Sequence, residues 1–410
     1  MGLGLAEQTL VRIIQGARGS FISPKIQVRR FPAMGLGVQA VEAIDEGEVV
    51  FTASHDVWKE YSAATARAEA HVQAPAFVER VDAYCGANKR MADAVLLATH
   101  IVLSDPSDVY LNSLPQNLDV PMSWSERRLD ELRHCDVLDT IMNSRHFYRK
   151  MHGDLFGIAP MVSGIEFQWA LSILMSRATS GKDQPFTLIP FFEWFNHSAS
   201  PTACTHEYID RDGAFVIRTT KRHAPHEQLF INYGDHSPAT YLRHYGFSSV
   251  EDARMLDPVS VKETLSLHDL PDADPTKPIK MQLARTLGWP DSKAVPYTIH
   301  TSGARDAQAL DFEWLRLFAA TKEELEHRQR TPADVAWLES NTQRVQGLLS
   351  TLCTNRLAKY HTSAETDLDL LRNNDSNTLE PWLASCVNVR LGEKLVLRSF
   401  LDEGLALQGR

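Results

Sequence analysis

The first part of the chain alternates apolar and polar residues in short runs that predict β-strands. Lys25 to Arg29, Val38 to Ala43 and Val49 to Phe51 are such runs, and the acidic turn 45–48 precedes the last of them. Before these strands, residues 9–16 place apolar side chains at helical spacing and end in glycine. The sequence therefore predicts a short helix followed by strands.

From residue 58 to about 156 the apolar positions recur at three and four, which indicates helices. The segment from Arg90 to Val102 is a clear example, and Ser123 or Ser125 is placed to cap another. Residues 163–166 open a further helix, which is predicted to end at Ser176-Arg177.

A second strand-rich block follows this helix. It begins with the apolar run 187–192, and residues 205–209 and 214–219 flank Asp210-Arg211-Asp212-Gly213, a good hairpin turn. Residues 228–233 form its last short strand.

From about residue 248 onward the chain is predicted to be helical. The segments with helical periodicity are 283–287, 311–320, 333–362, 367–372 and 380–400. Thr331 and Pro332 form a start signal for the third segment, because a capping residue precedes a proline in the first turn. Residues 271–278, dense in proline and aspartate, are expected to form a linker.

Composition narrows the classes of function. The 410 residues suggest two or three domains. The formal charge of −10 does not favour sequence-independent binding of nucleic acid, which needs a basic face. No run of 18 apolar residues is present, so no transmembrane helix and no membrane partner are expected. The scattered cysteines, typical of reduced intracellular thiols, are Cys85, Cys135, Cys204, Cys353 and Cys386.

The first forty residues contain five basic residues and one acid, Glu7, a composition that also occurs in mitochondrial presequences. We favour a surface helix followed by the first strand of the fold. The expected location is therefore intracellular, in the cytoplasm, the nucleus or both, with mitochondria as the weaker alternative.

A zinc site is a separate hypothesis. Cys204 with His206, and His223 with His226, could supply four ligands, but a hairpin turn separates the two pairs and the spacing matches no common zinc module. We therefore expect no metal.

Four ordered pieces carry the candidate chemistry. Asn196-His197 ends an apolar run, Tyr233-Gly234 ends a strand, and Tyr245-Gly246-Phe247 follows shortly after. The fourth piece is the turn Met34-Gly35-Leu36-Gly37 before a strand, with Asp45-Glu46-Gly47-Glu48 after it. In this order and spacing the pieces resemble a SET-domain protein methyltransferase.

The helical segment between the two strand-rich blocks, and the helical end of the chain, resemble the Rubisco large-subunit methyltransferase (LSMT) class of SET proteins. In that class a C-terminal helical domain helps to hold the protein substrate, and residues 360–363, 367–371 and 387–394 look like part of it. The resemblance implies an α+β fold, a β-rich SET core interrupted by a helical insert and followed by an all-helical C-terminal domain. The expected parts are 1–55 (first part of the core), 56–164 (insert), 165–248 (second part of the core, with the active site) and 249–410 (substrate-binding domain).

The resemblance also places S-adenosylmethionine, the methyl donor of the class. The implied cofactor-binding residues are Met34, Gly35, Leu36, Gly37, Ser176, Arg177, Glu193, Asn196, His197, Tyr233 and Phe247. Arg177 would engage the cofactor carboxylate, Phe247 would pack on the adenine, and Tyr233 would also be the catalytic residue. These residue types suit methyl transfer from a sulfonium, an in-line displacement that mainly requires alignment and aromatic walls around a cation.

Three residues are assigned to the substrate side of the site. Thr179 stands where lysine methyltransferases of the class usually have Phe, and the actin-histidine methyltransferase likewise combines a polar residue there with a large aromatic at the position of Phe192. Tyr245, in contrast, is lysine-like. We expect a lysine acceptor, with protein-histidine N-methylation as the alternative.

Some positions depart from the pattern of the class. Glu193 replaces an Asp, Met34 replaces a Glu, and Ala224-Pro225-His226-Glu227 replaces the common turn that ends in Gly-Glu. Because of Met34 and the altered turn, a catalytically inactive SET scaffold that binds protein partners stays open as a further alternative. The expected function is S-adenosylmethionine-dependent methylation of a protein side chain. The acidic balance favours a basic partner such as a ribosomal protein or a histone.

Overall fold

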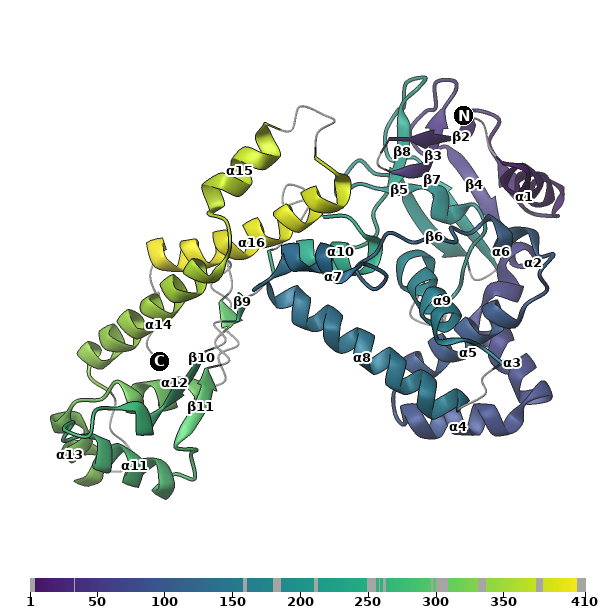
Figure 1. Cartoon of the computed structure of the whole chain (residues 1–410). Coiled ribbons are helices and arrows are strands. Elements are labelled where there is room, and N and C mark those ends of the chain that lie inside the picture. The colour runs from purple at the N-terminus through teal and green to yellow at the C-terminus, as the bar shows by residue number, and fades with distance from the viewer. Residues whose placement is uncertain are drawn as a thin grey trace.

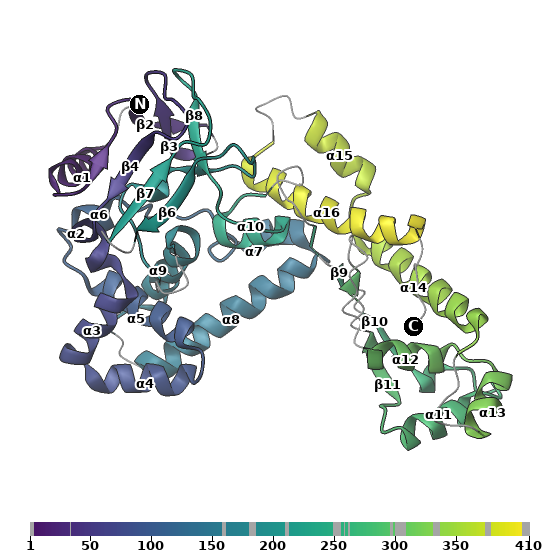
Figure 2. The same cartoon turned by 180° about the vertical axis from the view of Figure 1, so that it is seen from behind.

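The structure is a computed structural model of the chain. The residues that it describes are 4–32, 34–157, 161–179, 186–209, 213–248, 256–257, 259–260, 263–295, 298–299, 309–330, 337–373 and 379–403. Figure 1 shows a β-rich part surrounded by helices and an arm of helices that extends from it. Seen from behind in Figure 2, helix α16 (Pro381–Glu403) joins the arm to helix α10 (Pro238–Tyr245) of the β-rich part.

Two four-stranded sheets form the β-rich part. The first has the order β1-β4-β7-β6, with the strands Phe21–Ile22, Val49–Ala53, Ala214–Arg218 and Thr205–Ile209. The second has the order β2-β3-β8-β5, with the strands Ile26–Phe31, Gly35–Ala40, Gln228–Ile231 and Asn196–His197. Each sheet pairs strands from both sides of the helical insert, so neither can form until the two halves of the chain meet.

Helices separate the two halves of these sheets. Their bounds are α2 His55–Trp58, α3 Ala63–Gln73, α4 Pro75–Cys85, α5 Lys89–Leu103, α6 Val109–Ser113, α7 Glu126–Leu129 and α8 Asp136–Phe156, with the 3-10 turns η1 Lys59–Tyr61 and η2 Asp130–Leu132. The first helix of the chain, α1 (Leu5–Gly16), contacts α6 and buries Leu10 and Ile14. This basic N-terminal segment is thus part of the folded structure.

Helix α9 (Gly164–Arg177) crosses the β-rich part and ends at the predicted residues. A capping box starts it, in which the Ser163 hydroxyl accepts from the Glu166 amide and the Glu166 carboxylate accepts from the Ser163 amide. Its apolar face packs on α5 and buries Phe167, Leu171 and Leu174. This packing fixes where the last turn of α9 lies.

The arm is mainly helical. Its helices are α11 Lys277–Thr286, α12 Ala309–Phe318, α13 Lys322–Arg330, α14 Glu339–Lys359, α15 Ala364–Arg372 and α16. It also contains a short turn, η4 Leu267–Asp269, and two small antiparallel sheets, which pair β10 Glu263–Ser266 with β11 Ser292–Val295 and β9 Val259–Ser260 with β12 Thr298–Ile299.

The α+β class with a mainly helical C-terminal part is confirmed. The C-terminal part is not all-helical as expected, because it contains four strands. These strands are too short and polar to show an alternating pattern in the sequence.

The run 187–192 was predicted as a strand but is not one: Thr187 forms isolated bridges, and η3 (Phe192–Trp194) follows. Its side chains are buried on successive positions, because the run passes through the core. The expected linker 271–278 also runs into α11, which starts at Lys277.

Some predicted signals lie outside the described residues. They are Thr331-Pro332, the first four residues of the segment 333–362, and residues 210–212 of the hairpin turn.

Two hydrophobic cores hold the molecule together. The first joins the sheets to helices of the insert. The second contains residues of the arm, such as Val345, Leu349 and Val389, but also Ile141 of α8 and Leu242 of α10. The arm therefore shares its core with helices of the β-rich part.

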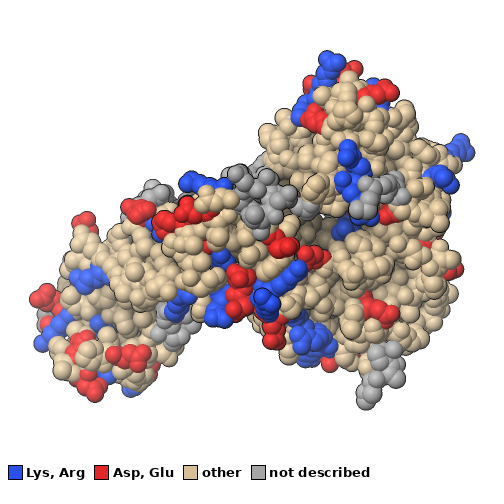
Figure 3. Space-filling model, turned by 45° about the horizontal axis from the view of Figure 1, so that its top comes forward, with Lys and Arg blue, Asp and Glu red and all other residues tan. Residues whose placement is uncertain are grey.

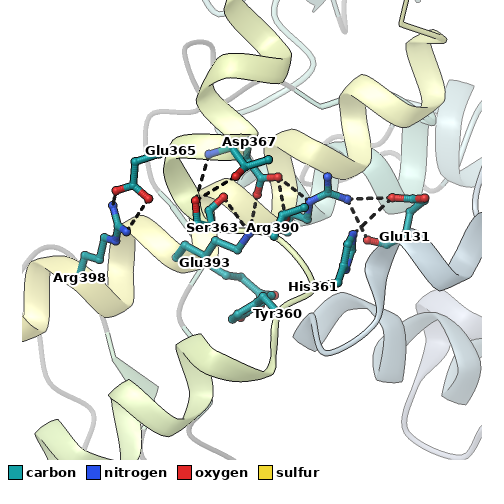
Figure 4. Close-up of polar contacts among 12 residues, drawn as sticks. Glu131, Tyr360, His361, Ser363, Glu365, Asp367, Arg390, Glu393 and Arg398 are labelled. Carbon is teal, nitrogen blue, oxygen red and sulfur yellow. Dashed lines mark hydrogen bonds and ion pairs between the residues drawn. The ribbon is translucent and has the colours of Figure 1, made fainter.

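Buried charges connect the same elements (Figure 4). Asp367 on α15 is fully buried and pairs with Arg390 at 2.9 Å and with Lys394 at 2.6 Å, both on α16. Arg390 also forms an ion pair with Glu131 of η2 at 2.9 Å, and Glu393 accepts a hydrogen bond from the backbone amide of Asp136 at 2.7 Å. Because a buried charge is costly without its partner, this network favours one orientation of the arm.

On the face shown in Figure 3, basic and acidic side chains are interspersed rather than gathered by sign. Within the described part of the chain, no helix combines the length and apolar character needed to span a bilayer.

Candidate active site

The second sheet brings distant segments of the chain together. β8 pairs antiparallel with β3, with Leu229 opposite Val38, and parallel with β5, with Phe230 opposite Asn196. The Asn196 side-chain amide donates to the Leu36 carbonyl at 3.1 Å. The predicted glycine-rich turn and the Asn-His pair are therefore neighbours.

The backbone of this turn is closely packed on one side and open on the other. A Cβ atom at Gly37 would lie 2.7 Å from the Asn196 amide nitrogen and 2.6 Å from a ring carbon of Phe31, so a side chain does not fit there. Gly35 has a φ of +75° and open space beside it. Met34, at the start of this turn, is 52% exposed.

Tyr233 is held by two hydrogen bonds. Its backbone amide donates to Nδ1 of His197 at 3.0 Å, which assigns the remaining ring proton of a neutral His197 to Nε2. Its hydroxyl donates to the Phe195 carbonyl at 2.9 Å. Because the hydroxyl proton is engaged, only the oxygen lone pairs are left to interact with a ligand.

Five aromatic rings meet at this point. The His197 ring lies 5.2 Å from Tyr233, 4.7 Å from Tyr241 and 5.8 Å from Phe247, and Tyr245 lies 4.9 Å from Tyr233. Tyr241 was not predicted. The signal for it was available, because Tyr241 and Tyr245 are four residues apart and share one face of α10.

Burial affects the ionisation of these tyrosines. It raises the pKa of Tyr233 well above the ordinary value, and raises that of Tyr245 to about 12. Both phenols are therefore protonated at neutral pH. The aromatic cluster offers neutral rings and hydroxyls to a cation rather than a tyrosinate base.

Arg177 and Glu193 interact electrostatically with Tyr233, and Ser176 precedes Arg177 at the end of α9. Arg177 donates to the Ser176 hydroxyl at 3.2 Å and forms no ion pair with a described residue. Both carboxylate oxygens of Glu193 are buried, and neither has a hydrogen-bond partner among the described residues. Burial raises the pKa of Glu193 to about 7, opposed by the positive charge of Arg177.

Tyr110 of α6 is a further residue that the sequence did not point to. Its ring is buried, and its hydroxyl lies near the Glu193 carboxylate without meeting hydrogen-bond geometry. No sequence pattern links the two residues, because they belong to the insert and to the second half of the core. Glu193 thus faces an environment built from both.

The predicted substrate-side residues divide into two groups. Tyr245 belongs to the aromatic cluster. Thr179 instead pairs through its backbone with Thr187, at 2.9 and 3.0 Å, and the buried ring of Phe192 contacts the rings of His206 and Phe215. These contacts do not join Thr179 or Phe192 to the aromatic cluster.

The four residues of the zinc hypothesis do not form a ligand group. The Sγ atom of Cys204 lies 3.9 Å from Nε2 of His223, which also faces Glu227 at 3.2 Å, whereas the His206 ring packs on Phe192. Among the described residues no cluster of three or more His, Cys, Asp or Glu could hold a metal ion.

Two family models match this chain. Residues 35–234 match the SET domain, and residues 271–397 match the Rubisco LSMT substrate-binding domain. The chain is therefore a SET-domain protein methyltransferase. More narrowly, it belongs to the group in which the SET domain is followed by a Rubisco LSMT substrate-binding domain.

Curated relatives differ in their acceptors. The chain is 26% identical to the chloroplastic [fructose-bisphosphate aldolase]-lysine N-methyltransferase of Arabidopsis thaliana, over 91% of this chain and 78% of that protein. It is 25% identical to the Rubisco large-subunit N-methyltransferase of Nicotiana tabacum, over 72% and 62% of the two chains. It is also 26% identical to the actin-histidine N-methyltransferase of Homo sapiens, over 74% and 54%.

Solved structures show the same fold. The SET domain of LSMT bound to lysine and AdoHcy aligns with a TM-score of 0.69 at 22% identity, covering 98% of this chain and 91% of that one. Rubisco LSMT bound to AdoMet aligns with a TM-score of 0.67 at 21% identity, covering 100% and 98%.

S-adenosylmethionine is the cofactor of this class, and the residues present fit it. Arg177 forms no ion pair with a described residue and can bind a carboxylate. The Glu193 carboxylate and the aromatic rings suit the cationic groups of the cofactor. The close approach at Gly37 lets the backbone at Leu36 line the site. When bound, the cofactor supplies an electrophilic methyl group.

Proposed function

We propose that this protein methylates the side-chain amine of a lysine in another protein. The observation that carries the proposal is the position of Tyr233, whose hydroxyl is fixed to the Phe195 carbonyl within a cluster of neutral aromatic rings. A lone pair of the fixed Tyr233 oxygen can accept a hydrogen bond from the attacking amine and so orient it. The aromatic rings around Tyr233 suit an alkyl amine and a sulfonium.

The acceptor must be neutral when it attacks. A free lysine has a pKa of about 10.4, so deprotonating it near pH 7.4 costs roughly 4 kcal/mol. Removal from water lowers the lysine pKa and reduces this cost. The buried tyrosines do not act as the base, because their pKa values are raised. Their role is to align the acceptor.

Histidine is the second candidate acceptor. Thr179 is polar where lysine methyltransferases of the class usually have Phe, and Phe192 is a large aromatic beside Glu193. The similarity to actin-histidine N-methyltransferases supports this alternative. Tyr245 beside Tyr233, and the similarity to two lysine methyltransferases, favour lysine.

The identity of the protein substrate rests on weaker grounds. A net charge of −10 supports a basic partner such as a ribosomal protein or a histone. The named relatives act instead on aldolase, on the Rubisco large subunit and on actin. The search for the substrate therefore has to cover a whole proteome.

The test is methylation of a cell extract with isotope-labelled S-adenosylmethionine, followed by mass spectrometry of the labelled residues. Wild-type protein and Tyr233→Phe are compared in parallel. Label on lysine that depends on Tyr233 supports the proposal, and label on histidine selects the alternative. Binding of the cofactor without labelling of any protein would favour the inactive scaffold.

A further inference from the structure

A cavity with a mixed polar and apolar lining lies where α8, α9 and α10 meet, and its volume is about 210 Å³. The polar residues on its wall are Ser144, Tyr148, Ser172, Arg243 and His244. This volume is below the roughly 300–1,000 Å³ of pockets that hold drug-sized ligands. The cavity is thus suited to one side chain or one small ion.

Arg243 is the charged residue in this wall. It forms no ion pair with a described residue, and its Nε and Nη2 atoms lie 3.1 and 2.8 Å from Nε2 of His244. His244 is an uncharged acceptor, because burial, and then the charges of Arg243 and His236, lower its pKa to about 4, while a hydrogen bond to the Met175 carbonyl opposes this shift. A guanidinium has five N–H donors, so donors are left for a ligand.

No acidic residue is among those that line the cavity. Asp257 interacts electrostatically with Arg243 but forms no ion pair with it, and its carboxylate accepts hydrogen bonds from the Ser237 hydroxyl and from the Ala239 amide at 2.7 Å. A ligand carboxylate would therefore form the direct ion pair that Arg243 lacks among the described residues.

The cavity lies close to the methyl-transfer site along two helices. Ser172 precedes Ser176 by one turn of α9, and His244 directly precedes Tyr245 on α10. One helical turn spans about 5.4 Å, and an extended peptide advances about 3.3 Å per residue. A side chain two to four residues from the methylated residue can bridge such a separation.

We propose that this cavity binds the carboxylate of an aspartate or glutamate side chain of the protein substrate, within about four residues of the methyl acceptor, through the guanidinium of Arg243. The planar fork of arginine matches a carboxylate in two parallel hydrogen bonds. The attribution to a substrate rests on the methyl-transfer function proposed above. The capacity to bind a carboxylate does not, and it is tested separately.

The first experiment needs no enzymatic activity. The ring resonance of His244, assigned by its loss in His244→Gln, is followed by NMR at pH 7 while glutamate capped at both termini is added. Capped glutamine is the uncharged control. A saturable shift with capped glutamate, absent with capped glutamine and absent in Arg243→Gln, is the expected result. No saturable shift in the wild-type protein overturns the proposal, and saturation by inorganic phosphate alone reassigns the cavity to a free anion.

The second experiment uses a peptide from the identified substrate. Replacing the anchoring acid by its amide should lower kcat/KM by about 10- to 100-fold in the wild-type protein, as expected for a charge-assisted hydrogen bond, and should have no effect in Arg243→Gln. Arg243→Lys should retain part of the discrimination. Arg149→Gln, which changes an exposed arginine of α8 outside the cavity, is the matched control. Equal kcat/KM for wild type and Arg243→Gln on every acidic peptide overturns the substrate role, even where the NMR result is positive.

Discussion

Replacing Glu193 by glutamine should remove a large pH dependence from the stability of the protein. The pKa of Glu193 is raised from 4.5 to about 7 in the folded protein, because burial of its carboxylate outweighs the opposing effects of the Glu193 backbone amide, the Arg177 charge and the Tyr110 hydroxyl. The folded state therefore holds this proton more tightly than the unfolded state does. The stabilisation is complete below pH 4.5 and is lost as the pH rises through about 7. At 1.36 kcal/mol per pKa unit, the loss is about 3 kcal/mol.

The assay is urea unfolding of wild type and Glu193→Gln between pH 5 and 8. Ionisable groups that both proteins share contribute equally to their free energies of unfolding and cancel in the difference. The free energy of unfolding of the wild type should therefore fall by up to about 3 kcal/mol relative to that of the variant across this range. Glu207→Gln, at an exposed position of β6, serves as the control and should change nothing. Parallel pH profiles for wild type and Glu193→Gln would refute the assignment of a raised pKa.

The same residue should link cofactor binding to proton release. With a pKa of about 7, Glu193 is about half protonated at pH 7, and a cation placed beside it would release about half a proton. Calorimetry of S-adenosylmethionine binding in buffers with different ionisation enthalpies measures this number directly. S-adenosylhomocysteine lacks the sulfonium charge and isolates its contribution. Equal proton release by Glu193→Gln would show that the carboxylate does not face the cofactor.

Three further substitutions test other parts of the structure. Tyr233→Phe should lower the single-turnover rate of methylation by about 10²–10³-fold, and a normal rate would contradict the catalytic assignment. It should also cost about 1–3 kcal/mol of stability if the Phe195 carbonyl is left without a donor. Asn196→Ala should weaken S-adenosylmethionine binding by roughly 1–3 kcal/mol in calorimetry, and unchanged affinity would leave only its bond to Leu36 as a role. Asp367→Asn removes the counter-charge of buried Lys394 and one of the two acidic partners of buried Arg390, and should cost about 3–5 kcal/mol in urea unfolding. A loss below about 1 kcal/mol would mean that this network is dispensable.

The sequence was informative wherever a short motif determines the local backbone. Gly37 has no room for a Cβ atom, and Asn196 and His197 form a strand whose neighbours are set by pairing, so motif and geometry agree. The capping box at Ser163 likewise placed the start of α9. The capping box depends only on residues close together in the sequence, whereas the positions of Gly37 and Asn196 were predicted from the resemblance to the SET family.

Features that depend on distant residues could not be predicted in the same way. Tyr110 approaches Glu193 only because the insert folds back over the core, and no periodicity encodes this contact. Helix α13 was not among the predicted segments because Leu325 is the single apolar residue in the sequence of Lys322–Arg330, so the segment lacks the apolar stripe that reveals a helix. The cavity at Arg243 requires three helices to meet, and none of them shows it alone.

Helix α10 connects the chemistry of the site to the arm. One face presents Tyr241 and Tyr245 to His197 and Tyr233, while Leu242 and Ala239 belong to the core that the arm completes. Deleting the arm would expose this apolar face and release the helix that carries the aromatic cluster, so a truncated protein would lose activity whether or not the arm binds substrate. Loss of activity on truncation therefore says nothing about recognition. Single surface substitutions on the arm separate substrate recognition from support of α10. A substitution that lowers activity but leaves the affinity for S-adenosylmethionine unchanged acts on substrate recognition.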